Sequence, residues 1–156
     1  MTVSVLFVCL GNICRSPLAE AALRGEAERL GIEIAVDSAG TGDWHVGSPP
    51  DPRAVAVAKR SGVDISHLRA RQVERADFHR FDHVVALDAQ NLRDLERLRP
   101  QGAEARLSLL LDHVPGREGE AVADPYYGED DHFDLTWNDV TAGARALARR
   151  IAGERG

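Results

Sequence analysis

Short apolar segments typical of β-strands alternate with amphipathic segments typical of α-helices along the sequence. Such an alternation predicts a parallel sheet with right-handed crossovers and helices on both of its faces. The chain of 156 residues has the size of one ordinary domain, so we expect residues 1–156 to form one α/β domain around an open four-stranded sheet. The expected strands are residues 3–9, 32–37, 82–87 and 107–111, and the expected helices are residues 16–30, 51–60, 89–98 and 134–150.

The charge balance and the cysteine content exclude several classes of protein. The 19 Lys and Arg residues against 25 Asp and Glu give a net charge of −6. This balance argues against nucleic-acid binding, because phosphate contacts require a basic face. Two Cys residues form no disulfide framework and fit a reducing cytoplasm. The apolar segment 3–10 follows no Lys or Arg, and no segment reaches the roughly 20 apolar residues that span a membrane. We therefore expect a cytoplasmic protein that binds neither nucleic acid nor membrane.

The segment Cys-Leu-Gly-Asn-Ile-Cys-Arg-Ser-Pro, residues 9–17, connects the first expected strand to the first expected helix. A short loop that returns to a helix start directs consecutive backbone N–H groups into one concavity, which binds anions. Gly11 permits a positive φ, and Arg15 offers a planar fork for two oxygens of a phosphoryl group. The expected phosphate-binding residues are Leu10, Gly11, Asn12, Ile13, Cys14, Arg15 and Ser16.

The two cysteines of this segment have different expected roles. Cys9 faces a helix N-terminus, several N–H groups and Arg15, an environment that favours the nucleophilic thiolate over the thiol. The alternative is that Cys9 is a small apolar residue at the end of a buried strand. Cys14 is more simply a packing residue at the start of the helix. The alternative is that Cys14 forms a reversible disulfide with Cys9 and so shields Cys9 from over-oxidation.

The segment from Cys9 to Pro17 resembles the active-site loop of the low-molecular-weight protein tyrosine phosphatases. The sequence Asp124-Pro125-Tyr126-Tyr127 resembles the general-acid loop of that family. The resemblance covers essentially the whole chain, with the motifs in the family's order. It continues in residues 37–41, 47–51, 66–67, 71–72 and 91–95.

The resemblance implies a hydrolysis of phosphomonoesters in two steps, without a metal or an organic cofactor. Cys9 attacks phosphorus and forms a phosphocysteine, while the loop amides and Arg15 hold the phosphoryl oxygens. Asp124 protonates the leaving phenolate and then, as a carboxylate, activates the water that releases phosphate. Expected partners are a phosphotyrosine-containing protein substrate and phosphate or other oxyanion inhibitors. We expect a monomer or a weak dimer.

The resemblance also implies a set of supporting residues. Ser16 would hydrogen-bond the sulfur of Cys9 and help it to leave. Asn12, Ser38 and His67 would form a polar network that fixes the loop, although His67 is equally well an ordinary loop histidine.

Three of the four Tyr and Trp residues fall in expected loops, namely Trp44, Tyr126 and Tyr127. A slot for a phenyl ring needs flat apolar walls, which favours these residues as walls for the substrate. For Tyr127, packing or a regulatory site is an alternative.

Other functions on a similar scaffold stay open. An arsenate reductase relays a disulfide through further cysteines, and this chain has only Cys14 besides Cys9. Protein-arginine phosphatases carry Thr where Ile13 stands, so Ile13 favours phosphotyrosine by analogy with the family. A non-catalytic phosphate-binding or redox-sensing module is the third alternative, against which the combination of Cys9, Arg15 and Asp124 argues.

Two clusters outside these motifs have simpler explanations than metal binding. His79 and His83 have the i, i+4 spacing of a zinc pair on a helix, but they precede an expected strand. The acidic residues 129–132 lack the Gly and terminal Glu of a calcium loop, and favour the N-terminus of the helix that follows. We therefore expect no metal site.

Overall fold

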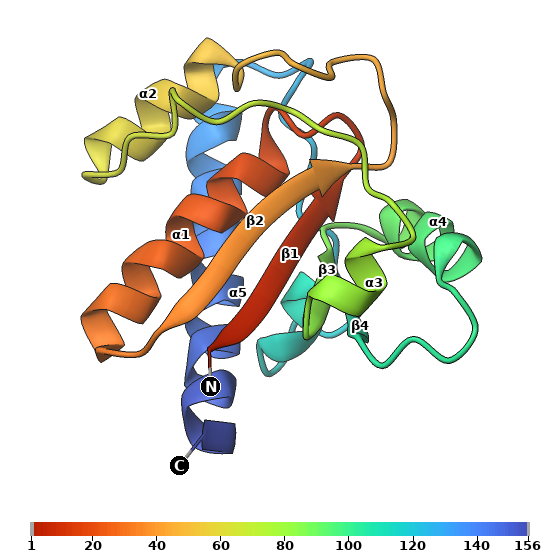
Figure 1. Ribbon diagram of the computed structural model, residues 1–156. Helices are drawn as coiled ribbons and strands as arrows, with labels where there is room; N and C mark the ends of the chain where they lie inside the picture. Colours follow the sequence, from red (N-terminus) through yellow and green to blue (C-terminus); the bar gives the residue numbers. More distant parts are fainter. Residues whose placement is uncertain (1, 156) are drawn as a thin grey trace.

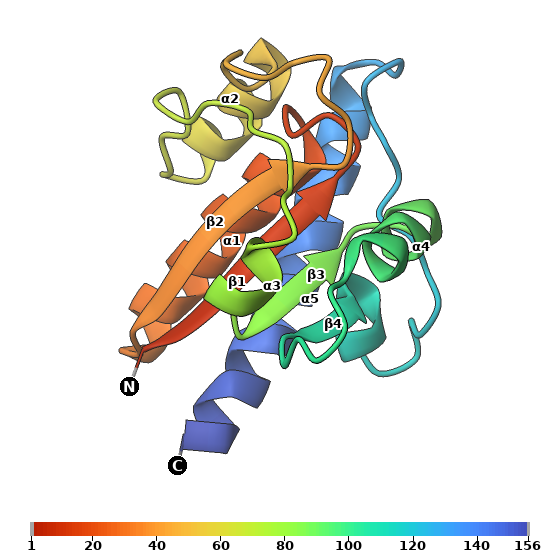
Figure 2. The same cartoon turned by 45° about the vertical axis from the view of Figure 1, so that its right-hand side comes forward.

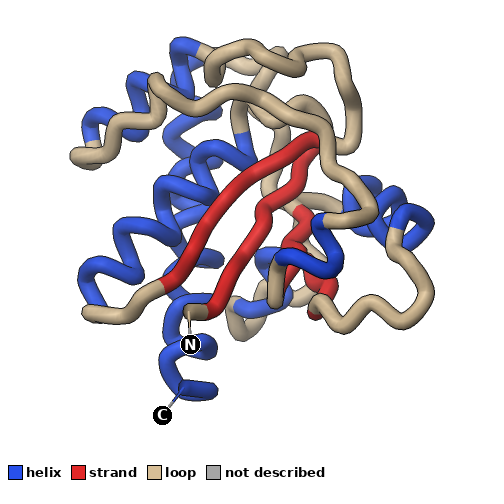
Figure 3. Tube along the Cα trace, viewed as in Figure 1, coloured by secondary structure: helices blue, strands red, loops and turns tan. Residues whose placement is uncertain are grey.

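The computed structural model of the protein describes residues 2–155 and confirms the α/β fold (Figure 1). Its four strands are all parallel and lie in the order β2-β1-β3-β4. Helices cover both faces of the sheet (Figures 1 and 3). The elements are β1 (Val3–Cys9), α1 (Arg15–Leu30), β2 (Ile34–Gly40), α2 (Pro52–Arg60), α3 (Asp77–Arg80), β3 (His83–Ala86), α4 (Ala89–Leu98), β4 (Arg106–Leu109), the 3-10 helix η1 (Leu110–His113) and α5 (Asp130–Arg155).

The central strand β1 is buried on both faces, which explains its uninterrupted apolar sequence. Val5 and Phe7 pack into a core that α1, α2 and α5 share. Leu6 and Val8 pack into a second core on the opposite face, together with side chains of α3 and α4. Successive side chains of a strand point to opposite faces, so one short segment supplies both cores.

The strand order places the loops after β1 and β3 side by side. The chain runs from β1 to β2 on one edge and then returns to β3 on the other side of β1. In an open α/β sheet, ligands bind at the carboxyl ends of the strands where the order reverses. The carboxyl ends of β1 and β3 meet this condition, and Figure 2 shows both ends on the same edge of the sheet.

Several expected boundaries are wrong. α1 begins at Arg15 rather than Ser16, and no side chain caps it. The fourth strand ends at Leu109, where the chain turns into η1. α5 begins at Asp130 rather than Asp134, because the acidic residues that we expected in a loop form its first turn. The four-residue helix α3 was not expected.

The structure also bears on the membrane and zinc alternatives. Within residues 2–155, no helix is both long and apolar enough to cross a membrane. His79 lies in α3 and His83 in β3, so the two histidines do not share a helix. Among the described residues, no three His, Cys, Asp or Glu side chains are grouped to hold a metal ion.

Candidate active site

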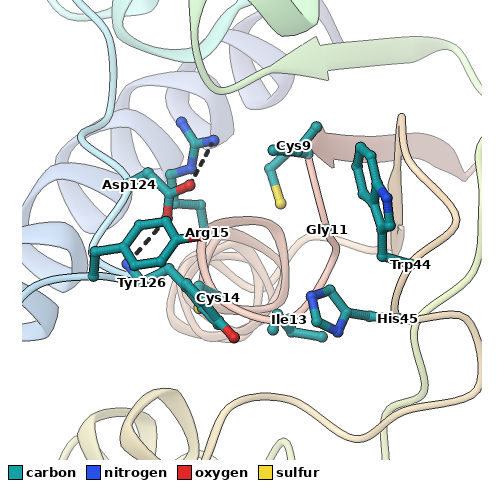
Figure 4. Close-up of a pocket in the computed structure, with 11 residues that line it drawn as sticks. Cys9, Gly11, Ile13, Cys14, Arg15, Trp44, His45, Asp124 and Tyr126 are labelled. Atoms are coloured by element: carbon teal, nitrogen blue, oxygen red, sulfur yellow. Dashed lines mark hydrogen bonds and ion pairs between the residues drawn. The ribbon is translucent and has the colours of Figure 1, made fainter.

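The loop between β1 and α1 bends around the sulfur of Cys9 (Figure 4). In the part of the chain that the structure describes, the backbone N–H groups of residues 11–16 donate to no other group of the protein. Free N–H groups at a helix N-terminus, together with the helix dipole, form a binding site for an anion. The positive φ of the loop, 58°, lies at Asn12, although Gly11 also permits one. Asn tolerates this left-handed conformation better than most residues.

Two glycines leave room for close neighbours here, the backbone of the loop at Gly40 and the ring of His45 at Gly11. A Cβ atom at Gly40 would lie 2.8 Å from the carbonyl oxygen of Leu10 and 3.2 Å from the amide nitrogen of Asn12. A Cβ atom at Gly11 would lie 3.0 Å from Cδ2 of His45. The end of β2 therefore packs directly against the loop and supports it from behind.

A chain of hydrogen bonds fixes the loop and reaches the sulfur. The Nδ2 amide of Asn12 donates to the hydroxyl oxygens of Ser16 (2.8 Å) and Ser38 (3.0 Å). Ser38 donates in turn to Oε1 of Glu20 (2.8 Å), and burial raises the pKa of Glu20. Ser16 Oγ lies 3.0 Å from Cys9 Sγ. The hydroxyl of Ser16 thus lies between the sulfur and a second acceptor, the carbonyl oxygen of Ala39 (3.4 Å).

The guanidinium of Arg15 is buried between two acidic side chains. Its Nη1 donates to Asp88 Oδ2 (2.7 Å) and to the carbonyl oxygen of Val122 (2.9 Å). Its Nη2 lies 3.7 Å from Oδ2 of Asp124. Burial opposes the charged form, but the charges of Cys9, Asp88 and Asp124 outweigh burial and raise the pKa of Arg15. Arg15 is therefore a permanent cation at the base of the site.

The loop that carries Asp124 is held from α2. Arg53 donates to the carbonyl oxygens of Tyr126 (2.8 Å) and Gly128 (2.9 Å), and its guanidinium lies 4.6 Å from the ring centroid of Phe133. Oδ1 of Asp124 accepts a hydrogen bond from the backbone N–H of Tyr126 (3.1 Å). Asp124 itself is 43% exposed, with Oδ2 directed toward Arg15.

These residues surround one cavity of about 360 Å³. Trp44 and Tyr126 stand on opposite sides of the Cys9 sulfur, with His45 beside Trp44 (Figure 4). Tyr127 also lines the cavity and meets Tyr126 edge to face, with ring centroids 4.9 Å apart, but it is 96% exposed. The cavity is thus polar at its base and flanked by aromatic rings at its mouth.

The structure brings most of the predicted site residues together, and His67 is the exception. His67 is exposed in a surface hollow beside Arg24, and among the described residues no hydrogen bond joins it to Asn12 or Ser38. The backbone N–H of Arg71 donates to Oδ1 of Asn12 instead (3.0 Å). Cys14 is buried as a free thiol, and burial raises its pKa.

Three residues of the site were not expected from the sequence, namely His45, Glu20 and Arg53, whereas Asp88 was expected near the site from its place after the third strand. Asp88 follows an expected strand, which is the one local signal for its place beside Arg15. The other three reach the site through contacts between elements distant in sequence, and no spacing motif marks them.

Comparisons with known proteins agree with this geometry. The family model described as low molecular weight phosphotyrosine protein phosphatase matches residues 4–155. The protein of that name from Schizosaccharomyces pombe is 48% identical over 134 residues, which are 84% of this chain and 85% of the relative. The crystal structure of YfkJ from Bacillus subtilis has a TM-score of 0.92 at 38% identity and covers 100% of this chain and 98% of its own.

A second similar structure bears on the alternative substrate. The crystal structure of DARP, a Drosophila arginine phosphatase, has a TM-score of 0.88 at 30% identity, over 94% of this chain and 96% of its own. The fold alone therefore does not separate the two substrate classes. The match of the family model over residues 4–155, together with relatives of high identity over most of their length, shows that the chain belongs to the low molecular weight phosphotyrosine protein phosphatase family.

Proposed function

We propose that the protein hydrolyses phosphotyrosine in protein substrates through a phosphocysteine on Cys9. The observation that carries the proposal is that Cys9, Arg15 and Asp124 line one cavity at the N-terminus of α1. A nucleophile, a cation and a carboxyl group are the three groups that transfer of a phosphoryl group to a thiolate requires.

In the first step, the thiolate of Cys9 attacks phosphorus, so that an S–P bond forms as the P–O bond to the phenol breaks. The guanidinium of Arg15 and the N–H groups of residues 11–16 hold the phosphoryl oxygens, whose charge they offset. The carboxylic acid of Asp124 gives its proton to the leaving phenolate oxygen. The products are the phosphocysteine and a tyrosine side chain.

In the second step, the carboxylate of Asp124 accepts a proton from water, whose oxygen attacks phosphorus. The S–P bond breaks, and the thiolate of Cys9 and inorganic phosphate are released. The hydroxyl of Ser16, 3.0 Å from the sulfur, stabilises the charge that returns to Cys9. Phosphate and other oxyanions would bind the same loop and inhibit the reaction.

Two features favour phosphotyrosine over phosphoarginine. Trp44 and Tyr126 flank the cavity, and flat aromatic walls suit a phenyl ring. The apolar side chain of Ile13 lines the same cavity and is almost buried. A cytoplasmic protein that is a monomer or a weak dimer is part of the same proposal, and two free cysteines fit the reducing environment of the cytoplasm.

The test is hydrolysis of p-nitrophenyl phosphate, with EDTA present, by wild type and by Cys9→Ser. We expect turnover by wild type and a loss of at least about 10³-fold in Cys9→Ser, because the hydroxyl is a far weaker nucleophile. Binding of phosphate, measured by calorimetry, checks that the variant keeps its loop. Turnover that persists in Cys9→Ser, or a folded wild type that binds phosphate without turnover, would contradict the proposal.

A second assay, with phosphopeptides, decides between the two substrate classes. Phosphotyrosine and phosphoarginine peptides of matched sequence should differ in kcat/KM in favour of phosphotyrosine. The opposite order would support the arginine phosphatase alternative on the same catalytic groups.

A further inference from the structure

A second hollow adjoins the cavity that holds Cys9. It has a volume of about 290 Å³ and lies between the loop after β2 and α4. Leu10 and Trp44 line both hollows, so that the two share a rim. The partly exposed side chain of Leu98 supplies apolar surface to the second hollow, and the buried side chains of Val73 and Leu95 form its floor. We name this hollow the flanking groove.

Trp44 separates the flanking groove from the catalytic cavity. Its indole lies against Gly42, where a Cβ atom would be 2.0 Å from Cζ3 of the ring. Only glycine leaves room for the ring in this position. The two residues that line both hollows are exposed to solvent, Trp44 to 71% and Leu10 to 43%. Large apolar side chains exposed together beside a binding site mark a surface that a ligand covers.

Of the three polar side chains that line the flanking groove, Gln72 and Asp94 have partners within the protein, whereas the hydroxyl of Thr41 is buried without a hydrogen-bond partner among residues 2–155. The side-chain amide of Gln72 donates to the carbonyl oxygen of Thr41 (3.1 Å). The carboxylate of Asp94 accepts from Gln90 and forms an ion pair with Arg97. A ligand in the groove therefore meets apolar surface rather than an unpaired charge. The occupant that fits is apolar.

We propose that the flanking groove binds an apolar side chain of the phosphoprotein substrate, such as Leu, Ile, Met or Phe, close in sequence to the phosphotyrosine. The inference rests on the proposed function and adds a determinant of substrate choice. Continuity with the cavity favours a segment of the substrate over a separate ligand. A chain that leaves the cavity across Leu10 and Trp44 passes directly onto the groove.

Phosphotyrosine peptides test the proposal when Leu, Ser or Asp is placed in turn at each of the three positions on either side. For wild type we expect kcat/KM to be about 10-fold higher with Leu than with Ser at one or two of these positions, the effect of one apolar side chain in a pocket. Asp at those positions should be the poorest. In Leu98→Ala the preference for Leu should fall at least about threefold, because the groove loses apolar contact.

The matched control is Leu92→Ala. Leu92 lies on the same helix and packs partly buried against the same core as Leu98, but it does not line the groove. It should keep the wild-type preference, and both variants should hydrolyse p-nitrophenyl phosphate, which is too small to reach the groove, at the wild-type rate. A flat preference in a wild type that hydrolyses p-nitrophenyl phosphate would overturn the groove alone, as would an unchanged preference in Leu98→Ala. A wild type inert toward p-nitrophenyl phosphate would overturn the proposed function, and the groove with it.

Discussion

Two carboxyl groups flank Arg15, and their hydrogen bonds separate their roles. Both oxygens of Asp88 are engaged, Oδ2 by Arg15 (2.7 Å) and Oδ1 by the backbone N–H of Asn91 (2.7 Å). Asp124 has one oxygen in a turn and the other toward the cavity, 3.7 Å from Arg15. A group that transfers a proton needs a free oxygen at the reacting atoms. We therefore infer that Asp124 is the acid and base and that Asp88 positions Arg15.

This division predicts that Asp124→Asn and Asp88→Asn differ in how their loss of activity depends on the leaving group. Asp124→Asn should slow the hydrolysis of phenyl phosphate by about 10² to 10³-fold, the usual contribution of a general acid. Its kcat/KM for p-nitrophenyl phosphate should fall much less, because kcat/KM reports formation of the phosphocysteine, in which p-nitrophenolate leaves without a proton. Asp88→Asn should lower kcat/KM for both substrates by a similar factor. Equal losses on both substrates in Asp124→Asn would assign the proton to another group.

At the scale of the elements, α2 is the part of the scaffold that joins the two catalytic loops. The backbone N–H of Asp51, the N-cap of α2, donates to the carbonyl oxygen of Ile13 (2.8 Å). Two residues later, Arg53 holds the loop of Asp124 through the carbonyl oxygens of Tyr126 and Gly128. One helix N-terminus therefore sets the distance between the phosphate-binding loop and the acid.

We expect Arg53→Gln to lower activity on phenyl phosphate selectively, as Asp124→Asn does, but by a smaller factor. With the loop less firmly held, hydrolysis of phenyl phosphate should fall by about 10-fold, since a misplaced acid loses part of its effect. The kcat/KM for p-nitrophenyl phosphate should change little, because its phenolate leaves without a proton as the phosphocysteine forms. Arg60→Gln is the matched control, because Arg60 lies at the other end of α2 and, among residues 2–155, forms its ion pair with exposed Asp134. A loss with p-nitrophenyl phosphate as large as that with phenyl phosphate would show a general structural defect instead.

The elements also show where reasoning from sequence succeeds. α4 has the predicted bounds, because Asp88 caps it and its apolar residues follow a helical period. The four residues of α3 are too few to show any period, and the acidic start of α5 has the composition of a loop. The pairing of Arg15 with Asp88 depends on the order of β1 and β3 in the sheet, and local sequence does not encode that order.

For the whole molecule, two histidines link stability to pH. Burial, and then the charge of Arg106, lower the pKa of His83 at the start of β3. Burial, and then the charge of Arg150, lower the pKa of His113 in η1. Glu154, Asp82 and Asp112 oppose these shifts only in part. Both histidines are therefore harder to protonate in the folded protein than in the unfolded chain, where a histidine has a pKa of about 6.5.

The unfolded chain consequently binds more protons than the folded protein below about pH 6.5, and stability is lost as pH falls through this range. Glu20 acts in the opposite sense, since burial raises its pKa and folding then takes up a proton. We expect the urea midpoint of wild type to fall between pH 7 and pH 5.5, and the fall to be smaller in the double variant His83→Gln, His113→Gln. His79→Gln, at an exposed position of α3, should keep the wild-type slope. If the double variant lost stability with pH as steeply as wild type, the two buried histidines would not be the groups that titrate.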